Sequence, residues 1–322
     1  MRFAVILLLA AAFGTGVSWA RSVRAPMVGA SPLEGSRIEG SGYPLALTGP
    51  AGDMQVIPAM PQRIVSMVLL GDEILTEIAA PGRLAGLTYF STDPVSSNCV
   101  DRVPPGVTLV DDDPEQILSL EPDLLLASAY TETSFVRFMA QSGIPVLYLS
   151  GYNAIDDVRR NLRLIALATG DVDRGEALVS TFDSRLEDVA RRVAGLPRPR
   201  VLYFMGDSTT HGRGTTIDDI INRSGGTNVA ATEAGINGVR RLAHEAAIAL
   251  DPDVILLSRY GDGDDAVVRD RYLKNPDWRE VGAVRTGRVY TILDRELINL
   301  SHHVASGVEG VARVLHPEAF TE

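Results

Sequence analysis

Aromatic, arginine and histidine side chains occur in the loops that follow the predicted strands of this chain. Ligands of open parallel sheets bind beyond the carboxyl ends of the strands, so a binding site is expected in these loops. Aromatic rings supply apolar faces, and guanidinium groups pair with carboxylates or with an anionic chelate. For any one residue the alternative is a place on the loop rim or a salt bridge between two lobes of the protein. The candidate residues are Tyr89, Phe90, Tyr130, His211, Arg213, Arg259, Tyr260, Arg295 and His302.

The histidines among these candidate residues could bind a metal ion. A single imidazole, together with the phenol of Tyr89 or the imidazole of His211, is a plausible set of ligands for a ferric, cobalt or haem centre. His302 is followed directly by His303. Side chains of adjacent residues diverge in regular structure, so we do not expect both to bind one ion. The alternative is a histidine that begins a helix or lies on the surface, and direct ligation of a metal stays open.

A serine motif points to a different chemistry. Gly206-Asp207-Ser208 follows a predicted strand and looks like the nucleophile block of GDS-type serine esterases, with a histidine such as His302 to activate the serine. That block normally opens its domain, whereas here it lies well inside the chain. The Asp-x-x-His block is also missing, because Asn299 stands in the position of the aspartate. A secreted esterase is therefore the weaker alternative, and we expect no enzyme activity.

The elements that must position these residues alternate between strand and helix. Residues 43–57 contain two short alternating segments around a Gly-Pro-Ala-Gly turn, which predicts a β-hairpin. The apolar run at 64–70 has the length and composition of a strand buried on both faces. Asp113-Pro114-Glu115 predicts the start of a helix, with an N-cap aspartate, a proline at the first helical position and an acidic residue in the first turn. Alternating strands and helices predict βαβ units and a mainly parallel sheet.

A long amphipathic helix is predicted in the middle of the chain, at residues 171–196. Gly170 precedes it, and Gly195 and Pro197 mark its end. Its apolar residues recur at steps of four and three and form one stripe. They are Leu178, Phe182, Leu186, Val189 and Val193.

The sequences before and after this helix look like two versions of one unit. PEQILSLEPDLLLAS, which begins at residue 114, is matched by HEAAIALDPDVILLS, which begins at residue 244. In this alignment Glu115 corresponds to Glu245, and Asp123 corresponds to Asp253. Two α/β lobes of similar plan are the simplest interpretation. The alternative is chance similarity, because amphipathic patterns recur freely.

Length and composition favour two domains and exclude several partners. The 322 residues are enough for two domains of about 130 residues each. The net charge of −11 argues against nucleic acid or an anionic membrane surface as partner. Cys99 is the only cysteine, which excludes an internal disulfide and a four-cysteine metal site.

Residues 1–20 resemble a secretory signal peptide. Arg2 supplies a positive charge, residues 3–13 form an apolar run too short to span a bilayer, and Ser18-Trp19-Ala20 resembles a cleavage site. The alternative is a membrane anchor. We expect export to the periplasm of a bacterium with two membranes, without a lipid anchor, because no cysteine lies near the cleavage site. Residues 21–42 are predicted to be a flexible leader, since they are rich in Gly, Ser, Pro and Arg.

Several short motifs, taken in their order along the chain, resemble the helical-backbone periplasmic substrate-binding proteins, the family that delivers cobalamin, ferric siderophores and haem to ABC importers. The resemblance covers residues 43–320, nearly the whole mature chain. The motifs are the hairpin with Pro61-Gln62-Arg63-Ile64-Val65-Ser66, the Pro-Asp strands at Asp123 and Asp253, Gly214-Thr215 leading to Gly225-Gly226-Thr227-Asn228, Trp278 with Gly287-Arg288-Val289-Tyr290, and His316-Pro317-Glu318.

The resemblance implies an α/β fold of two Rossmann-like lobes with mainly parallel sheets, joined by one long rigid helix. The N-terminal lobe would occupy residues 43–169, the connecting helix 170–196 and the C-terminal lobe 197–322. A ligand would be held in the cleft between the lobes, with only modest closure on binding. The protein would act as a monomer without a resident cofactor. Its partners would be a small-molecule metal chelate and the permease and ATPase complex of an importer.

Glu115 and Glu245 occupy the two positions that dock onto permease arginines in the family that the chain resembles. Each begins the helix before a Pro-Asp strand, in equivalent places of the two lobes. The alternative is that a first-turn glutamate only complements the helix dipole, which contributes about 0.3–1 kcal/mol. The dipole alone does not require a symmetric placement, so we favour docking.

The ligand is expected to be a ferric siderophore or a corrinoid such as vitamin B12, with haem as the alternative. Cobalamin binders of the family usually place an aromatic residue before the first docking glutamate, where this chain has Leu109. Haem binders usually carry a tyrosine before the proline of the second-strand loop, where this chain has Asp93 before Pro94. Leu109 therefore weakens the case for cobalamin and Asp93 weakens the case for haem, but neither residue excludes its ligand.

Overall fold

The computed structural model describes residues 35–50, 52–151, 153–205, 208–259, 264–298 and 300–321. The predicted signal peptide, most of the predicted leader, Tyr260 and the first two residues of the serine motif lie outside these ranges. Strand β1 (Arg37–Glu39) lies within the predicted leader and pairs with β2 (Leu45–Thr48). The leader prediction is wrong for these three residues, because Ile38 packs against the core of the first lobe.

The predicted hairpin is confirmed. Strand β3 (Met54–Ile57) pairs antiparallel with β2, and β1 completes a three-stranded sheet. Beside it lies a five-stranded parallel sheet whose first strand in the sequence is central. Its strands, in spatial order, are β6 (Thr108–Val110), β5 (Leu84–Thr88), β4 (Ile64–Ser66), β7 (Leu124–Ser128) and β8 (Val146–Leu149). Its helices are α1 (Leu69–Ile78), α2 (Pro114–Ser119), α3 (Thr133–Gln141) and α4 (Ile155–Thr169), with short turns η2 (Pro81–Arg83), η3 (Tyr89–Thr92) and η4 (Val100–Arg102).

The second lobe repeats the parallel plan with four strands. In spatial order they are β11 (Thr227–Asn228), β9 (Arg200–Phe204), β13 (Val254–Arg259) and β14 (Val289–Leu293), and β10 (Thr209–His211) pairs antiparallel with β12 (Val239–Arg241). Its helices are α6 (Thr216–Arg223), α7 (Val229–Thr232), α8 (His244–Ala249), α9 (Asp265–Leu273), α10 (Gly282–Arg285), α11 (Asp294–Leu297) and α12 (Val304–Leu315), with short turns η5 (Pro276–Trp278) and η6 (Pro317–Phe320). The two parallel sheets confirm the predicted α/β fold of two Rossmann-like lobes.

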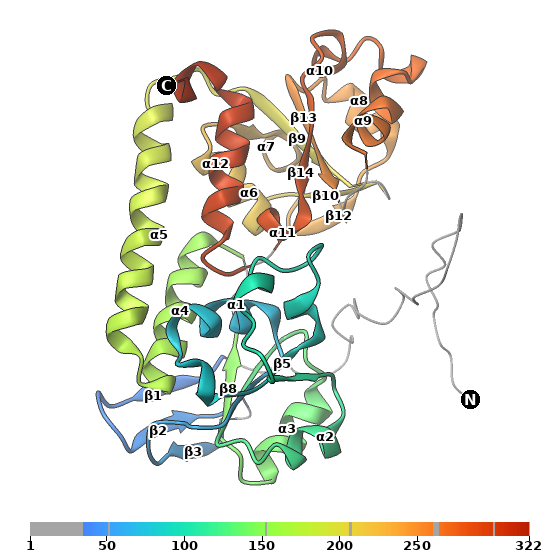
Figure 1. The fold of residues 1–322 in the computed structure, drawn as a ribbon. Helices are drawn as coiled ribbons and strands as arrows, with labels where there is room; N and C mark the ends of the chain where they lie inside the picture. Colours follow the sequence, from blue (N-terminus) through green and yellow to red (C-terminus); the bar gives the residue numbers. More distant parts are fainter. Residues whose placement is uncertain are drawn as a thin grey trace, which may run out of the picture.

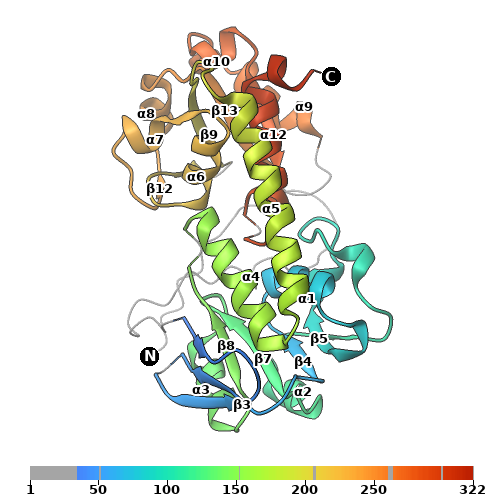
Figure 2. The ribbon, with the colours of Figure 1, turned by 90° about the vertical axis from the view of Figure 1, so that its left-hand side faces the viewer.

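Helix α5 (Val172–Val193) runs along both lobes, as Figures 1 and 2 show from two sides. Val179 belongs to the core of the first lobe, whereas Phe182, Leu186 and Val189 belong to a core of the second. The apolar stripe predicted from the sequence is therefore shared between the two lobes. Among the residues that the structure describes, no helix combines the length and the apolar composition needed to cross a membrane.

The start of α5 is fixed to the first lobe by close packing and a buried ion pair. A Cβ atom added to Gly175 would lie 2.3 Å from the Cβ of Ala166, so glycine is needed where α5 crosses α4. Asp171, the residue before α5, receives two hydrogen bonds from Arg83 Nη1, at 2.9 and 3.1 Å. The same guanidinium donates from Nε to the Pro61 carbonyl at 2.7 Å. These contacts set the direction of the connecting helix.

Equivalent arginines support α2, which precedes β7 in the first lobe, and α8, which precedes β13 in the second. Arg63 Nε donates to the C-cap carbonyl of α2 at 2.7 Å, and Arg200 Nη2 donates to the C-cap carbonyl of α8 at 2.6 Å. Asp123 accepts from the backbone N–H of Arg63 at 2.9 Å, and Asp253 accepts from that of Arg200 at 2.8 Å. The same contacts in both halves explain the repeated Pro-Asp pattern and argue against chance similarity.

Candidate functional site

The structure places most of the predicted ligand residues at the carboxyl ends of strands. Strand β5 ends at Thr88, directly before Tyr89 and Phe90 in η3, and Tyr130 follows the end of β7 with its side chain exposed. In the second lobe, Arg259 ends β13 and Arg295 lies in α11 after β14, whereas His211 ends β10, which pairs antiparallel with β12 outside the parallel sheet. Parallel sheets bind ligands at this edge.

Tyr89 and Phe90 are held by a buried aspartate. Their ring centroids lie 4.1 Å apart, and the Tyr89 side chain is 46% exposed. Asp72, in the first turn of α1, is fully buried and accepts a hydrogen bond from Thr88 N at 3.1 Å. Asp72 therefore fixes the loop that presents the two rings. Asp72 was not predicted from the sequence as a site residue, although it is an acidic residue within the apolar stretch 68–75.

Burial raises the pKa of Asp72 to about 8. Hydrogen bonds from Thr88 and Ser66 partly offset the loss of hydration. The carboxyl group is then protonated in the folded protein at pH 7, whereas an exposed aspartate is ionised. The folded chain holds one more proton here than the unfolded chain does.

We expect Asp72→Asn to reduce the loss of stability with rising pH. Because the folded-state pKa is raised, Asp72 contributes stability that is fully present below pH 4 and is lost as the pH rises towards 8. Between about pH 6 and pH 7.5 the wild-type free energy of unfolding should fall by about 2 kcal/mol more than that of the variant. Urea unfolding at both pH values measures this difference. The exposed Asp53→Asn serves as control, and equal pH slopes in wild type and Asp72→Asn would contradict the assignment.

Glu73, next to Asp72, joins the two lobes. It is fully buried and accepts hydrogen bonds from Asn98 N at 2.7 Å and Nδ2 at 3.0 Å, and from the hydroxyl of Ser301 in the second lobe. Asn98 Nδ2 also donates to Arg295 O at 3.0 Å, and Arg295 Nη1 donates to Pro94 O at 2.5 Å. Arg295, predicted to contact a ligand, therefore takes part in a contact between the lobes. A role for Glu73, Asn98 or Ser301 was not predicted from the sequence.

The candidate residues of the second lobe differ in the contacts that they make with the rest of the protein. The His211 ring lies edge-on to Tyr203, with centroids 5.3 Å apart, and burial lowers the pKa of His211 to about 4. Its imidazole is thus neutral at pH 7 and able to bind a metal centre. Arg213 is exposed beside β10. Arg259 forms an ion pair with Asp265 at 2.7 Å, within the second lobe.

The prediction that His302 and His303 diverge is wrong. Their ring centroids lie 4.0 Å apart at an interplanar angle of 39°. The two residues form a turn before α12, and the divergence rule holds only in regular structure. His302 is buried, and its Nε2 lies 3.6 Å from Oε1 of Glu77 in the first lobe.

Ser208 lies in the turn between β9 and β10. Its backbone has a φ of 70°, its N–H donates to Met205 O at 3.0 Å, and its carbonyl accepts from Leu242 N at 2.9 Å. The histidine suggested as its base, His302, instead faces Glu77. The geometry of Ser208 and His302 gives the esterase alternative no support.

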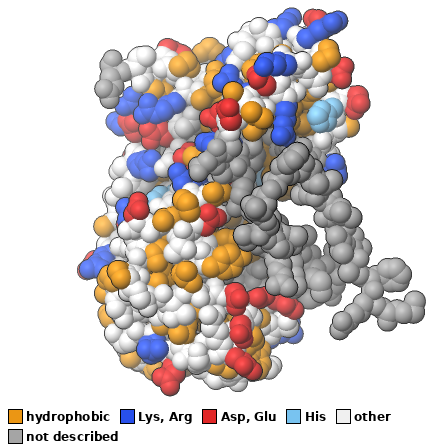
Figure 3. Space-filling view, turned by 45° about the vertical axis from the view of Figure 1, so that its right-hand side comes forward, with side chains coloured by type: hydrophobic (Ala, Val, Ile, Leu, Met, Phe, Trp, Pro, Cys, Tyr) orange, Lys and Arg blue, Asp and Glu red, His pale blue; other side chains and the backbone are white. Residues whose placement is uncertain are grey.

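Glu115 and Glu245 occupy equivalent positions, as the repeat predicts. Each is the second residue of a six-residue helix, α2 or α8, and each is exposed. The Asp113 side chain caps α2 by accepting from Glu115 N at 2.9 Å, whereas α8 begins after Ala243 without a side-chain cap. The face drawn in Figure 3 carries acidic side chains on both lobes.

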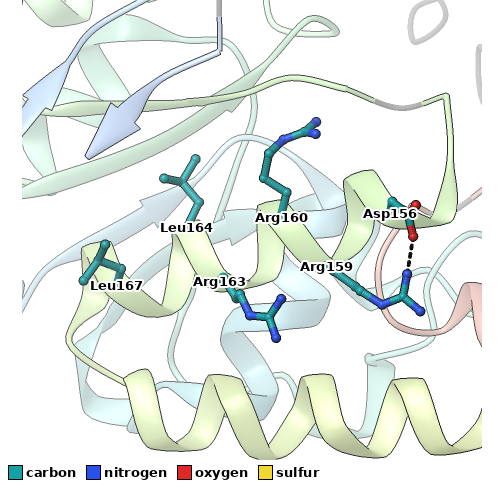
Figure 4. A pocket seen from close by; sticks show the side chains of 6 residues that line it. All are labelled: Asp156, Arg159, Arg160, Arg163, Leu164 and Leu167. Atoms are coloured by element: carbon teal, nitrogen blue, oxygen red, sulfur yellow. Dashed lines mark hydrogen bonds and ion pairs between the residues drawn. The ribbon is translucent and has the colours of Figure 1, made fainter. Parts of the chain in front are cut away.

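A surface hollow of about 440 Å³ lies on α4, away from the strand ends, and Figure 4 shows its arginines. Arg159 pairs with Asp156 and Asp183, and Arg160 and Arg163 also have carboxylate partners. These cations are already neutralised by the protein. We therefore place the candidate site at the strand ends and the lobe junction.

Known proteins resemble this chain over most of its length. An uncharacterized ABC transporter substrate-binding lipoprotein of Bacillus subtilis, YvrC, is 25% identical over 290 residues, which is 87% of this chain and 88% of the relative. A cobalamin-binding protein of Halobacterium salinarum is 26% identical over 261 residues, 80% of this chain and 70% of the relative. The apo structure of the periplasmic haem-binding protein RhuT of Roseiflexus sp. RS-1 superposes with a TM-score of 0.66 at 24% identity, covering 80% of this chain and 99% of that one.

The comparison with protein families covers the elements that build the candidate site. The periplasmic binding protein family matches residues 64–296. This range runs from β4 to α11 and includes both parallel sheets and the connecting helix. The chain therefore belongs to the periplasmic binding protein family.

Proposed function

We propose that this protein is the substrate-binding component of an ABC importer and captures a metal chelate between its two lobes. The observation that carries the proposal is the placement of aromatic and arginine side chains at the ends of parallel strands in both lobes, with Arg295 in a contact between the lobes and His211 in the connection after β9. The Bacillus relative is named as an ABC transporter substrate-binding protein, and the Halobacterium relative as a cobalamin-binding protein. Both names agree with this class of function.

A ferric siderophore or a corrinoid fits the chemistry of these side chains. Tyr89 and Phe90 offer adjacent rings for the apolar body of a chelate. Arg213 offers an exposed cation for its carboxylates, and neutral His211 offers a ligand to the metal. Haem remains the alternative. Asp93, which stands where haem binders of the family usually have a tyrosine, accepts hydrogen bonds from Val95 N and from the Ser96 hydroxyl and so shapes its own loop.

Titration of the purified protein tests the proposal. Cyanocobalamin, a panel of ferric siderophores and hemin are added in turn, with binding followed by calorimetry and tryptophan fluorescence. Trp278 is 1% exposed in a core of the second lobe, so its quenching reports energy transfer to a coloured ligand and not direct contact. We expect saturable binding of one siderophore or corrinoid. Binding of hemin alone would favour the alternative, and no binding by any member would contradict the proposal.

We expect Tyr89→Ala and Arg213→Ala each to weaken binding of the identified chelate about tenfold or more, by loss of an apolar contact and of a charge-assisted hydrogen bond. Calorimetry with that chelate measures the change, and circular dichroism checks the fold. Arg279→Ala removes an exposed arginine far from the strand ends and should leave the affinity unchanged. Undiminished affinity in both site variants would show that the ligand binds elsewhere.

We further propose export of the chain to the periplasm, on the basis of residues 1–20, which lie outside the described residues. The Bacillus relative is named as a lipoprotein, which leaves the predicted absence of a lipid anchor without support. Mass spectrometry of the protein purified from its own cells decides the point. A chain cleaved after Ala20 supports a signal peptide, and an uncleaved chain contradicts it.

A further inference from the structure

Three potential metal ligands, one from the first lobe and two from the second, lie close together. Glu77 comes from α1 of the first lobe, and His302 and His303 come from the turn before α12 of the second. One ligand atom of each residue lies within 4.8 Å of the others. Glu77 is one helical turn beyond Glu73, which accepts a hydrogen bond from Ser301, so the cluster adjoins an existing contact between the lobes.

The histidine ring nitrogens of this cluster have few protein partners. In the part of the chain that the structure describes, Nε2 of His303 has no hydrogen-bond partner, and Nε2 of the 8% exposed His302 has only the Glu77 carboxylate, at 3.6 Å. Buried polar atoms are nearly always paired, and leaving one unpaired is costly. A bound metal ion would use the lone pair of a neutral imidazole.

The donor set and its spacing suit a tetrahedral ion. Two histidines and one glutamate are a donor set that proteins use for Zn²⁺, with a fourth position left for water. Bonds of 2.0–2.1 Å at tetrahedral angles place neighbouring donor atoms about 3.4 Å apart. Oε1 of Glu77 and Nε2 of His302 are 3.6 Å apart, so a small rotation of either side chain brings them to that distance.

Arg102 competes with a metal ion for the Glu77 carboxylate, since its Nη1 lies 2.9 Å from Oε1 of Glu77. Its side chain is 49% exposed and can turn into solvent when an ion takes its place.

We propose that Glu77, His302 and His303 form a binding site for a divalent transition-metal ion of the zinc class, which links the first lobe to the second. The site is distinct from the chelate site at Tyr89, His211 and Arg213. An ion bound here joins α1 to the turn before α12 and adds to the contacts that hold the lobes at a fixed separation. It is a structural cation of the protein and not the transported ligand.

Calorimetric titration of the full, chelator-treated protein with ZnCl₂ tests the site. We expect one zinc ion per chain. Glu77→Gln and His303→Gln should each lower the affinity at least tenfold, because each removes one of three ligands. His303 is less buried than His302, so its replacement is the safer variant for folding. The matched control is His244→Gln, which alters an exposed histidine of α8.

Thermal unfolding supplies a second readout. Zinc should raise the Tm of the wild type and of His244→Gln, because an ion that binds only the folded state stabilises it, and should leave the Tm of His303→Gln nearly unchanged. Equal zinc affinity in wild type, Glu77→Gln and His303→Gln would overturn the proposal. Loss of zinc binding in His211→Gln with retention in His303→Gln would also overturn it, by placing the ion in the chelate site.

Discussion

Reversing the charge of the two glutamates that are predicted to dock on the permease, as Glu115→Arg with Glu245→Arg, is expected to abolish uptake while leaving the affinity for the chelate unchanged. Both side chains are exposed in equivalent helical positions, one on each lobe, and neither belongs to the candidate ligand site. Close charge pairs across protein interfaces contribute about 1.5–7 kcal/mol of coupling energy. Replacing two such attractions by repulsions should prevent a productive complex with permease arginines. Each single variant should show an intermediate loss.

Uptake by cells that lack the wild-type protein measures this effect, with calorimetry on the purified variants for the affinity. The control is Glu187→Arg with Glu280→Arg, which makes the same change of net charge at two exposed sites on α5 and beside α10. If the glutamates only complement the helix dipole, the docking variant should lose about 0.3–1 kcal/mol per site in stability and transport normally. Normal transport by that variant would therefore rule out the docking role.

The fold was predictable because the local patterns of the sequence and its internal repeat both favour it. The turn residues of the hairpin, the apolar strands and the stripe on α5 each define an element by local pattern. The repeated Pro-Asp pair adds long-range information, because Asp123 and Asp253 each accept from a backbone N–H at the start of the neighbouring strand. Strand β1 was not predicted. It has only three residues, of which Ile38 alone is partly buried, so the alternation of apolar and polar residues there is too short to stand out from a polar segment.

The candidate site was predictable only in outline. The strand ends follow from topology, so Tyr89 and Arg259 lie at the expected edge. The contacts between the lobes depend on pairs far apart in the sequence, such as Glu73 with Ser301, which no local pattern reveals. The approach of His302 to His303 depends on the dihedral angles of one turn. Residue types and spacing do not determine those angles.

Asp171→Ala is expected to destabilise the protein by about 3–5 kcal/mol, because it leaves the buried Arg83 guanidinium without its counter-ion. The side chains of Arg83 and Asp171 are only 9% and 12% exposed, so water cannot replace the lost carboxylate. In the variant, Arg83 still donates a hydrogen bond to the Pro61 carbonyl. Moving the unpaired guanidinium into solvent would break this hydrogen bond as well. Because the pair lies at the start of α5, the variant should also loosen the connection between the lobes.

Urea unfolding measures this change, and the same helix supplies its control. Glu176 of α5 pairs with Arg163, but both side chains are 51% exposed. Exposed pairs contribute about 0–1 kcal/mol, so Glu176→Ala should cost little. A steep difference between the two alanine variants would show that burial, and not the presence of an ion pair, fixes α5 to the first lobe. Equal and small losses in both variants would mean that the apolar stripe of α5 and the close approach of Gly175 to α4 suffice.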